Sequence, residues 1–220
     1  MHTTIVNLKK IINEINERLQ KNNEKSNPNV IAVSKTFGMD KIEPLINYGH
    51  IHFGENKVQE AVEKWTDLKK TNSNLKLHMI GKLQSNKVKQ VVPLFDYLHS
   101  LDNYKLAKKI HQEEKKNNKK IKIFIQINLG LEEQKSGINS KDLKDFYMQC
   151  INDLKLDIIG LMCLPPNDAD TKNYFSEMRK LVLENNFEHL SMGMSNDYLS
   201  AIDYGATFLR LGSKIFGARD

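Results

Sequence analysis

Apolar residues recur along the chain with two alternating spacings. Across the first 25 residues the spacing is helical, and one face carries Ile5, Leu8, Ile11, Ile12, Ile15 and Leu19. The same spacing predicts later helices at 58–68, 143–154 and 174–182. Between them lie short apolar runs typical of buried strands. We predict eight such strands, at 30–35, 50–54, 75–81, 97–101, 121–129, 156–164, 189–193 and 207–212.

An alternation of strands and helices indicates a parallel sheet with helices packed outside it. Eight such units in 220 residues favour an α/β fold with one closed (β/α)8 TIM barrel, which is compact beside the roughly 250 residues of the type. The alternative is an open doubly wound sheet, which normally carries a glycine-rich dinucleotide turn after its first strand. Residues 33–40, VSKTFGMD, contain one glycine, which favours the barrel. No linker or low-complexity segment divides residues 1–220, so we expect a single domain.

Composition argues against nucleic acid and membrane partners. The 33 basic and 27 acidic residues give a formal net charge of +6, but the lysines are scattered among acids and form no basic stripe. No apolar run approaches the roughly 20 residues of a membrane span, and the N-terminus lacks a signal-peptide core. Cys150 and Cys163 lie apart in apolar segments, as expected of buried thiols in a reducing compartment. We expect a soluble, cytoplasmic protein.

The candidates for chemistry are the residues at the carboxyl ends of the strands, where barrels of this kind carry their active face. The first strand ends on Lys35, Asn56 follows the second, and the third carries His78. Strand alternation places Lys35 on the same face as Ile31 and Val33, inside the barrel. An interior lysine pairs with a carboxylate, reaches the rim, or becomes a neutral amine that forms covalent bonds. Desolvation and a nearby cation favour the neutral amine.

The eighth strand places a second cation inside the barrel. In residues 207–212, TFLRLG, the two leucines share one face, and Phe208 and Arg210 share the other. A guanidinium cannot lose its proton and is costly to bury alone, so Arg210 requires a partner. An internal salt bridge and a ligand acceptor both meet that requirement.

The segments after the seventh and eighth strands predict a phosphate site. In each, a glycine and a serine precede a predicted helical turn, whose free amides bind anions, and barrels often hold phosphate in these two loops. A glycine turn with a capping serine is the alternative. The candidates are Ser195 in SMGMSND (191–197), and Gly212 and Ser213 in LGSKIFG (211–217). An aldehyde-reactive lysine, a phosphate nest and an interior arginine together match one ligand, pyridoxal 5′-phosphate (PLP).

Seven stretches of the chain carry a pattern that resembles the pyridoxal phosphate homeostasis proteins. This small PLP-binding family is related to the barrel domain of bacterial alanine racemase. The stretches span nearly the whole chain in family order: VIAVSKT, HFGENKVQE, HMIGKLQSNK, IQINLGLEEQKSGI, GLMCLPP, LSMGMSND and LRLGSKIFGARD. Two positions depart from the family pattern, because Lys57 replaces an aromatic residue and Lys214 is not the usual small residue.

The resemblance implies an alanine racemase N-terminal-domain-like barrel with PLP held as an internal aldimine on Lys35. It further implies that Ser195, Gly212 and Ser213 hold the phosphate. Arg210 would face the pyridine nitrogen, and Asn56 and Met194 would lie beside the cofactor. His78 falls in a family motif, and its contact with the cofactor is left open.

A PLP carrier is the function that the resemblance favours. An arginine at the pyridine nitrogen makes the ring a poor electron sink. Racemases on this barrel add a second domain that supplies a tyrosine base, whereas this sequence ends at Asp220, soon after the eighth strand. We expect a monomeric, non-catalytic protein of vitamin B6 homeostasis that buffers PLP and passes it transiently to PLP-dependent apo-enzymes.

Two alternatives remain open at the level of sequence. One is a single-domain PLP enzyme, a slow racemase or lyase that uses Lys35 as its base. The other is a zinc site, because His50 and His52 share a strand face near Glu55. One strand rarely presents three convergent ligands, and no fourth ligand is evident, so we predict no metal.

Overall fold

Eight parallel strands close into a barrel in the order of the sequence, with β8 hydrogen-bonded to β1. The computed structural model describes residues 1–22, 27–129, 136–166 and 170–218. The predicted (β/α)8 barrel is therefore confirmed, and each of the eight predicted strands is present. Their bounds are β1 Asn29–Val33, β2 His52–Glu55, β3 Lys76–Met79, β4 Tyr97–Leu101, β5 Lys122–Ile127, β6 Asp157–Cys163, β7 His189–Ser191 and β8 Phe208–Leu211.

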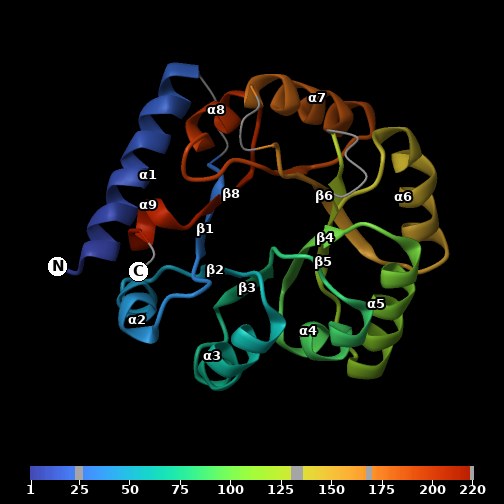
Figure 1. The fold of residues 1–220 in the computed structure, drawn as a ribbon, viewed down its shortest axis with the longest axis horizontal. Coiled ribbons are helices and arrows are strands. Elements are labelled where there is room, and N and C mark those ends of the chain that lie inside the picture. The colour runs from blue at the N-terminus through green and yellow to red at the C-terminus, as the bar shows by residue number, and fades with distance from the viewer. Residues whose placement is uncertain (23–26, 130–135, 167–169, 219–220) are drawn as a thin grey trace.

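Helices surround the strands on the outside of the barrel (Figure 1). They are α1 Thr3–Asn22, α2 Met39–Asn47, α3 Val58–Thr71, α4 Val88–Leu94, α5 Tyr104–Asn117, α6 Leu143–Asn152, α7 Thr171–Glu184, α8 Tyr198–Asp203 and α9 Ser213–Phe216, with 3-10 turns η1 Ser85–Lys87 and η2 Ser140–Asp142. Helix α1 packs against both α8 and α9, so the first helix supports the last two. Among the helices described, none has the length and apolar character needed to span a bilayer.

Three helices, α2, α4 and α5, go beyond the sequence prediction. Helices α2 and α4 are short and contain Pro44 and Pro93, which interrupt the regular pattern. Helix α5 buries two glutamates, Glu113 and Glu114, beside its apolar residues, so its buried face does not read as apolar. The helices predicted at 58–68, 143–154 and 174–182 correspond to α3, α6 and α7.

Strand alternation divides the core into two layers, as predicted for the eighth strand. Leu209 and Leu211 join the large core between the strands and the helices. Phe208 instead joins the smaller core inside the barrel. That inner core consists of Ile31, Val33, Phe124, Met162 and Phe208. Its small size leaves the barrel axis to polar and aromatic side chains, which build the site described below.

Phe208 anchors the inner core, and its removal tests how much that core contributes. The ring is 2% exposed, and its centroid lies 5.2 Å from that of Phe124 and 5.9 Å from that of His78. We expect Phe208→Ala to lower the free energy of unfolding by about 3–5 kcal/mol, because it leaves a cavity in a close-packed interior. Urea denaturation measures the change. Leu183→Ala, at a leucine that is 63% exposed, is the control and should change stability by less than about 0.5 kcal/mol. Equal losses in the two variants would contradict this division of the core.

Candidate functional site

All seven predicted cofactor residues line one cavity of about 660 Å³. The cavity lies at the carboxyl ends of the strands, which is the face expected to carry the chemistry of a barrel. Its wall is drawn from segments that are far apart in the sequence. The seven residues are Lys35, Asn56, Met194, Ser195, Arg210, Gly212 and Ser213.

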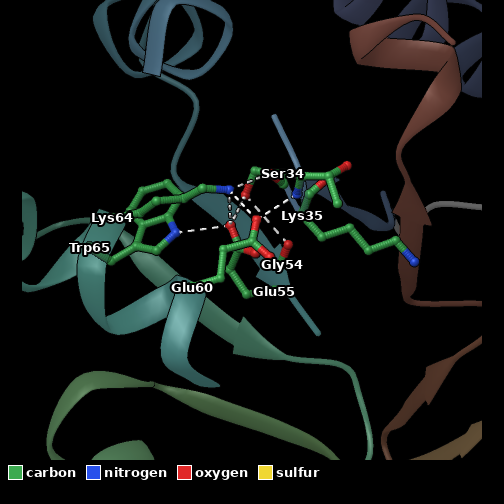
Figure 2. A network of polar contacts seen from close by, with 8 residues as sticks. Ser34, Lys35, Gly54, Glu55, Glu60, Lys64 and Trp65 are labelled. Carbon is green, nitrogen blue, oxygen red and sulfur yellow. Dashed lines mark hydrogen bonds and ion pairs between the residues drawn. The ribbon is translucent and has the colours of Figure 1, made fainter. Parts of the chain in front are cut away.

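Lys35 stands two residues beyond the end of β1, and its side chain points away from a polar network behind the strand (Figure 2). Ile31 and Val33 occupy the inner core, and Lys35 lines the cavity above it. The predicted shared face of these three residues is therefore observed. Because side chains two residues apart on a strand point to the same face, Lys35 faces inward like Ile31 and Val33, and its amine reaches the cavity.

A clamp of polar side chains holds the backbone on both sides of Lys35. It consists of the buried residues Ser34, Glu55 and Trp65 and the half-buried residues Glu60 and Lys64. The Lys64 ammonium donates to the Ser34 carbonyl at 2.9 Å and to Glu60 Oε1 at 2.6 Å. Figure 2 shows these contacts converging on one side of the chain while the Lys35 amine lies on the other. The clamp fixes the backbone on both sides of Lys35, and the Lys35 side chain extends to the cavity wall.

Thr36 adopts an unusual backbone conformation that the same clamp stabilises. Its φ is +68°, in the left-handed region that residues with a Cβ seldom occupy. The Thr36 amide donates to Glu60 Oε1 at 2.5 Å, and its hydroxyl donates to the Lys35 carbonyl at 2.6 Å. These bonds offset the strain of a sharp turn directly after Lys35.

Glu55 is fully buried at the centre of the clamp. Its Oε1 accepts hydrogen bonds from the Ser34 hydroxyl at 2.8 Å and from Trp65 Nε1 at 3.1 Å, and Lys64 Nζ lies 3.5 Å away. Burial raises the pKa of Glu55, and the neighbouring Lys64 opposes that rise. Sequence reasoning missed the structural role of this residue. The sequence did contain one sign of the clamp: Glu60 and Lys64 are four residues apart on α3, which is the spacing at which a glutamate and a lysine on a helix meet.

The three residues of the zinc alternative have separate partners. His50 Nε2 lies 2.9 Å from the His52 carbonyl, His52 Nδ1 lies 2.9 Å from His78 Nε2, and Glu55 belongs to the clamp. Within the ranges that the structure describes, no three histidine, cysteine or acidic side chains are grouped as a metal site would require. The geometry gives the zinc alternative no support.

Arg210 is 4% exposed and meets neutral acceptors inside the barrel. Its Nη1 donates to Ser191 Oγ at 2.6 Å, and its Nη2 donates to the Cys163 carbonyl at 2.8 Å. Burial lowers the pKa of the guanidinium, while Cys163 and Asp197 act in the opposite direction. Among the described residues no carboxylate forms an ion pair with Arg210, so of the two predicted partners the internal salt bridge is not found.

The loops after β7 and β8 meet where the phosphate was predicted. Gly193, at φ +87°, makes the first turn possible, because a Cβ there would lie 2.7 Å from the Cβ of Ala201. Asp197 Oδ1 accepts from the Met194 amide at 2.6 Å and closes the loop. The Lys214 amide points to Ser195 Oγ at 3.4 Å, which joins the two loops.

Asn56 supplies an acceptor that the protein leaves unused. Its Oδ1 is buried and has no hydrogen-bond partner among the residues described. Gly81 allows the ends of β2 and β3 to approach closely, since a Cβ there would lie 2.3 Å from the Asn56 carbonyl oxygen. A buried amide oxygen at a cavity wall is costly unless a ligand or water satisfies it. The donor set and this free acceptor fit a polar, anionic cofactor with an aldehyde.

His78 does not line the cavity and lies deeper, in a histidine column made of His52, His78 and His99. His78 Nδ1 is 2.9 Å from His99 Nε2, and His99 Nδ1 is 2.9 Å from Ser191 Oγ. The rings of His78 and Tyr97 stack at 4.2 Å between centroids. His78 therefore lies below the cavity, whereas Ile80 and Gly81 of the same family motif line its wall.

Replacement of Lys64 tests the clamp. Lys64→Met removes the donor to Ser34 and Glu60 and the cation nearest to the buried Glu55, so we expect the free energy of unfolding to fall by about 1–3 kcal/mol. Urea denaturation measures it. Lys70→Met is the matched control on the same helix, because Lys70 pairs with Asp67 in solvent and should contribute less than about 1 kcal/mol. An equal effect at both positions would show that the clamp adds nothing.

The buried histidines predict a loss of stability on mild acidification. Burial lowers the pKa of His50 and of His52 to about 4, and lowers the pKa of His78 and His99 well below 6.5. Below about pH 6.5 the unfolded chain therefore binds protons that the folded chain excludes, and each such proton costs the folded state about 1.4 kcal/mol per pH unit. Glu55 acts in the opposite direction, because its raised pKa favours the folded state as the pH falls.

Urea denaturation at pH 7, 6 and 5 checks this balance. Four histidines outweigh one glutamate, so the free energy of unfolding should fall steadily as the pH is lowered. His52→Leu should make this dependence on pH shallower, by an amount that corresponds to about one proton fewer taken up on unfolding. Stability that is constant or rises between pH 7 and pH 5 would refute the expectation.

The sequence and the fold match known proteins over nearly the whole length of this chain. Residues 6–220 match the family of the alanine racemase N-terminal domain. The pyridoxal phosphate homeostasis protein of Aquifex aeolicus is 36% identical over 94% of this chain and 96% of its own. That of Haemophilus influenzae is 36% identical over 98% and 97%.

Solved structures agree with these relatives. PipY of Synechococcus elongatus with PLP bound superposes with a TM-score of 0.80 at 32% identity, over 92% of this chain and all of that one. An alanine racemase of Clostridium difficile shares the fold, with a TM-score of 0.72 at 16% identity, over 99% of this chain and 57% of that one. The chain belongs to the pyridoxal phosphate homeostasis protein family, built on the barrel of the alanine racemase N-terminal domain.

Proposed function

We propose that this protein binds PLP in the 660 Å³ cavity as a Schiff base on Lys35, and that it serves in intracellular PLP homeostasis as a carrier without amino-acid turnover. The observation that carries the proposal is the convergence of the seven predicted residues on one cavity. The PLP-bound structure of PipY, a relative at 32% identity, supports the choice of ligand.

Each part of PLP has a complementary group in the cavity wall. The Lys35 amine would replace the aldehyde oxygen, so that a carbon–nitrogen double bond forms and water leaves. Ser195, Gly212 and Ser213 would hold the phosphate where the loops after β7 and β8 meet. Asn56 and Met194 would border the ring, and the free Asn56 Oδ1 would accept a hydrogen bond from a donor on the ligand or from a water beside it.

Arg210 argues for a carrier over an enzyme. When bound, PLP supplies an electrophilic carbon and a ring that withdraws electrons most strongly when its nitrogen is protonated. A guanidinium donates a hydrogen bond at that nitrogen and, as a group that is not deprotonated in proteins, retains its own proton. The ring nitrogen then stays unprotonated, which limits catalysis on the carbon attached to the amine.

The carrier role follows from holding a reactive aldehyde reversibly. The cavity rim includes the exposed residues Asn196 and Ser213, so bound PLP could exchange with the surroundings. We infer that one barrel domain, residues 1–220, acts as a cytoplasmic monomer. It would supply transiently bound PLP-dependent apo-enzymes and would need neither nucleic acid nor membrane.

One observation favours the alternative of a slow PLP enzyme. A second cavity of about 380 Å³, lined by Lys82, Asn128 and Tyr174 among others, adjoins the first and shares Ile80 and Gly81 with it. This space would admit a small amine beside the cofactor. Incubation of the PLP-loaded protein with a panel of amino acids separates the two functions, because turnover well above that of free PLP would favour the enzyme.

The covalent assignment has a direct test. We expect borohydride reduction of the PLP-loaded protein to leave one pyridoxyl group, which peptide mass spectrometry should locate on Lys35. Lys35→Ala should lose both the adduct and the absorbance near the visible edge. Lys57→Ala is the control, because Lys57 is exposed and follows Asn56 directly, and it should keep both signals. An adduct on another lysine, or unchanged absorbance in Lys35→Ala, would refute the assignment.

A further inference from the structure

A continuous line of hydrogen bonds crosses the barrel interior and ends on Arg210. From the far end, His52 Nδ1 lies 2.9 Å from His78 Nε2, and His78 Nδ1 lies 2.9 Å from His99 Nε2. His99 Nδ1 lies 2.9 Å from Ser191 Oγ, which accepts from Arg210 Nη1 at 2.6 Å. Five strands, β2, β3, β4, β7 and β8, each supply one member. The proposed roles of the cavity residues leave this line unexplained.

Arg210 sets the direction of every bond in the line. A guanidinium only donates, so Ser191 Oγ is an acceptor toward Arg210. The hydroxyl hydrogen of Ser191 is then available for His99 Nδ1, which must be unprotonated to accept it. If His99 Nδ1 donated instead, the Ser191 hydrogen would have no acceptor among the described residues. An unsatisfied buried donor costs about 1–3 kcal/mol, which opposes the reversed arrangement.

The direction continues through the histidine column. A neutral His99 that accepts at Nδ1 carries its proton on Nε2 and donates it to His78 Nδ1. His78 in turn donates from Nε2 to His52 Nδ1. Each ring therefore presents its lone pair toward Arg210 and its N–H away from it. Aligned in this way, the imidazole dipoles stabilise a cation at the Arg210 end, and the hydrogen bonds strengthen one another.

The charge of Arg210 requires such support. The residue is buried, and its two described acceptors, Ser191 Oγ and the Cys163 carbonyl, are neutral. A protonated histidine in the column would place a second positive charge in the barrel. Both His78 and His99 are fully enclosed, and their lowered pKa values keep them neutral. Two of the five N–H donors of Arg210 are used in these bonds, so three remain for other acceptors, and Arg210 lines the cavity.

We propose that Ser191, His99 and His78 are positioning residues, which hold the Arg210 guanidinium charged and oriented so that its remaining donors point to the ring nitrogen of bound PLP. This proposal rests on the proposed function for its ligand. The direction of the hydrogen bonds, however, is a property of the protein alone and is measurable without PLP.

Nitrogen-15 NMR of the histidine side chains in protein prepared without PLP tests the direction. We expect His78 and His99 to be neutral at pH 7, each with its proton on Nε2. In Ser191→Ala, His99 Nδ1 loses its donor, so the fixed tautomer of His99 should give way to a mixture. A proton on Nδ1 of His99 in the wild-type protein, or a doubly protonated ring, would overturn the proposal.

Equilibrium titration with PLP tests the consequence for the ligand. We expect Ser191→Ala and His99→Phe to weaken PLP binding about tenfold. His99→Gln should restore most of the affinity, because its amide accepts from Ser191 and donates to His78 as the native ring does. His189→Phe is the matched control, because His189 contacts Phe208 inside the barrel at 5.4 Å between centroids but lies outside the line.

The NMR experiment and the PLP titration together distinguish a failure of this inference from a failure of the proposed function. If the wild-type protein takes up no PLP, the proposed function fails, and the tautomers measured without PLP still decide the direction. If the wild-type protein binds PLP but His99→Phe fails to fold, Ser191→Ala decides the test. This variant removes only one oxygen atom, so the fold should tolerate it. Unchanged affinity in folded Ser191→Ala, or equal losses in His99→Phe and His189→Phe, would overturn the positioning role.

Discussion

A guanidinium cannot discard its charge when it is buried, and the position of Arg210 on β8 imposes that constraint on the centre of the barrel. The protein answers it with neutral acceptors, the Cys163 carbonyl and the Ser191 hydroxyl, and extends the second of these into the histidine column. Polar side chains therefore occupy an axis that a barrel without such a charge would fill with branched apolar residues. The small apolar inner core, which includes Phe208, packs around this axis.

The two cations at the cavity are supported in different ways, and the difference suits different tasks. Arg210 is held by its own side-chain bonds, so its direction is fixed. Lys35 is held by its backbone, through the clamp around Glu55 and Lys64 and through the turn at Thr36, and its side chain extends into the cavity. Under the proposed function, the fixed backbone would set the origin of the Lys35 side chain for the covalent bond, and the fixed guanidinium would present its donors to one atom of the ligand.

The fold alone does not choose between carrier and enzyme, because the same barrel occurs in an alanine racemase at 16% identity. The choice depends on the groups around the ligand. Under the proposed function, a donor that retains its proton would face the ring nitrogen, and the cavity rim includes exposed residues. The adjoining cavity beside Tyr174 is the feature that a catalytic function would have to use.

The sequence by itself determined the closed barrel, the order of its strands and the inward direction of Lys35 and Arg210, because strand alternation and strand–helix repetition are local patterns. It also placed the seven cavity residues at strand ends, where the fold brings them together. Only the tertiary structure decided the partners. His52, His78 and His99 lie on three different strands, and their hydrogen bonds depend on the register between those strands. Likewise, Glu55 was a possible metal ligand in sequence, and the packing of α3 against β2 made it the centre of a clamp. Such contacts depend on distances between segments far apart in the chain, which no local pattern contains.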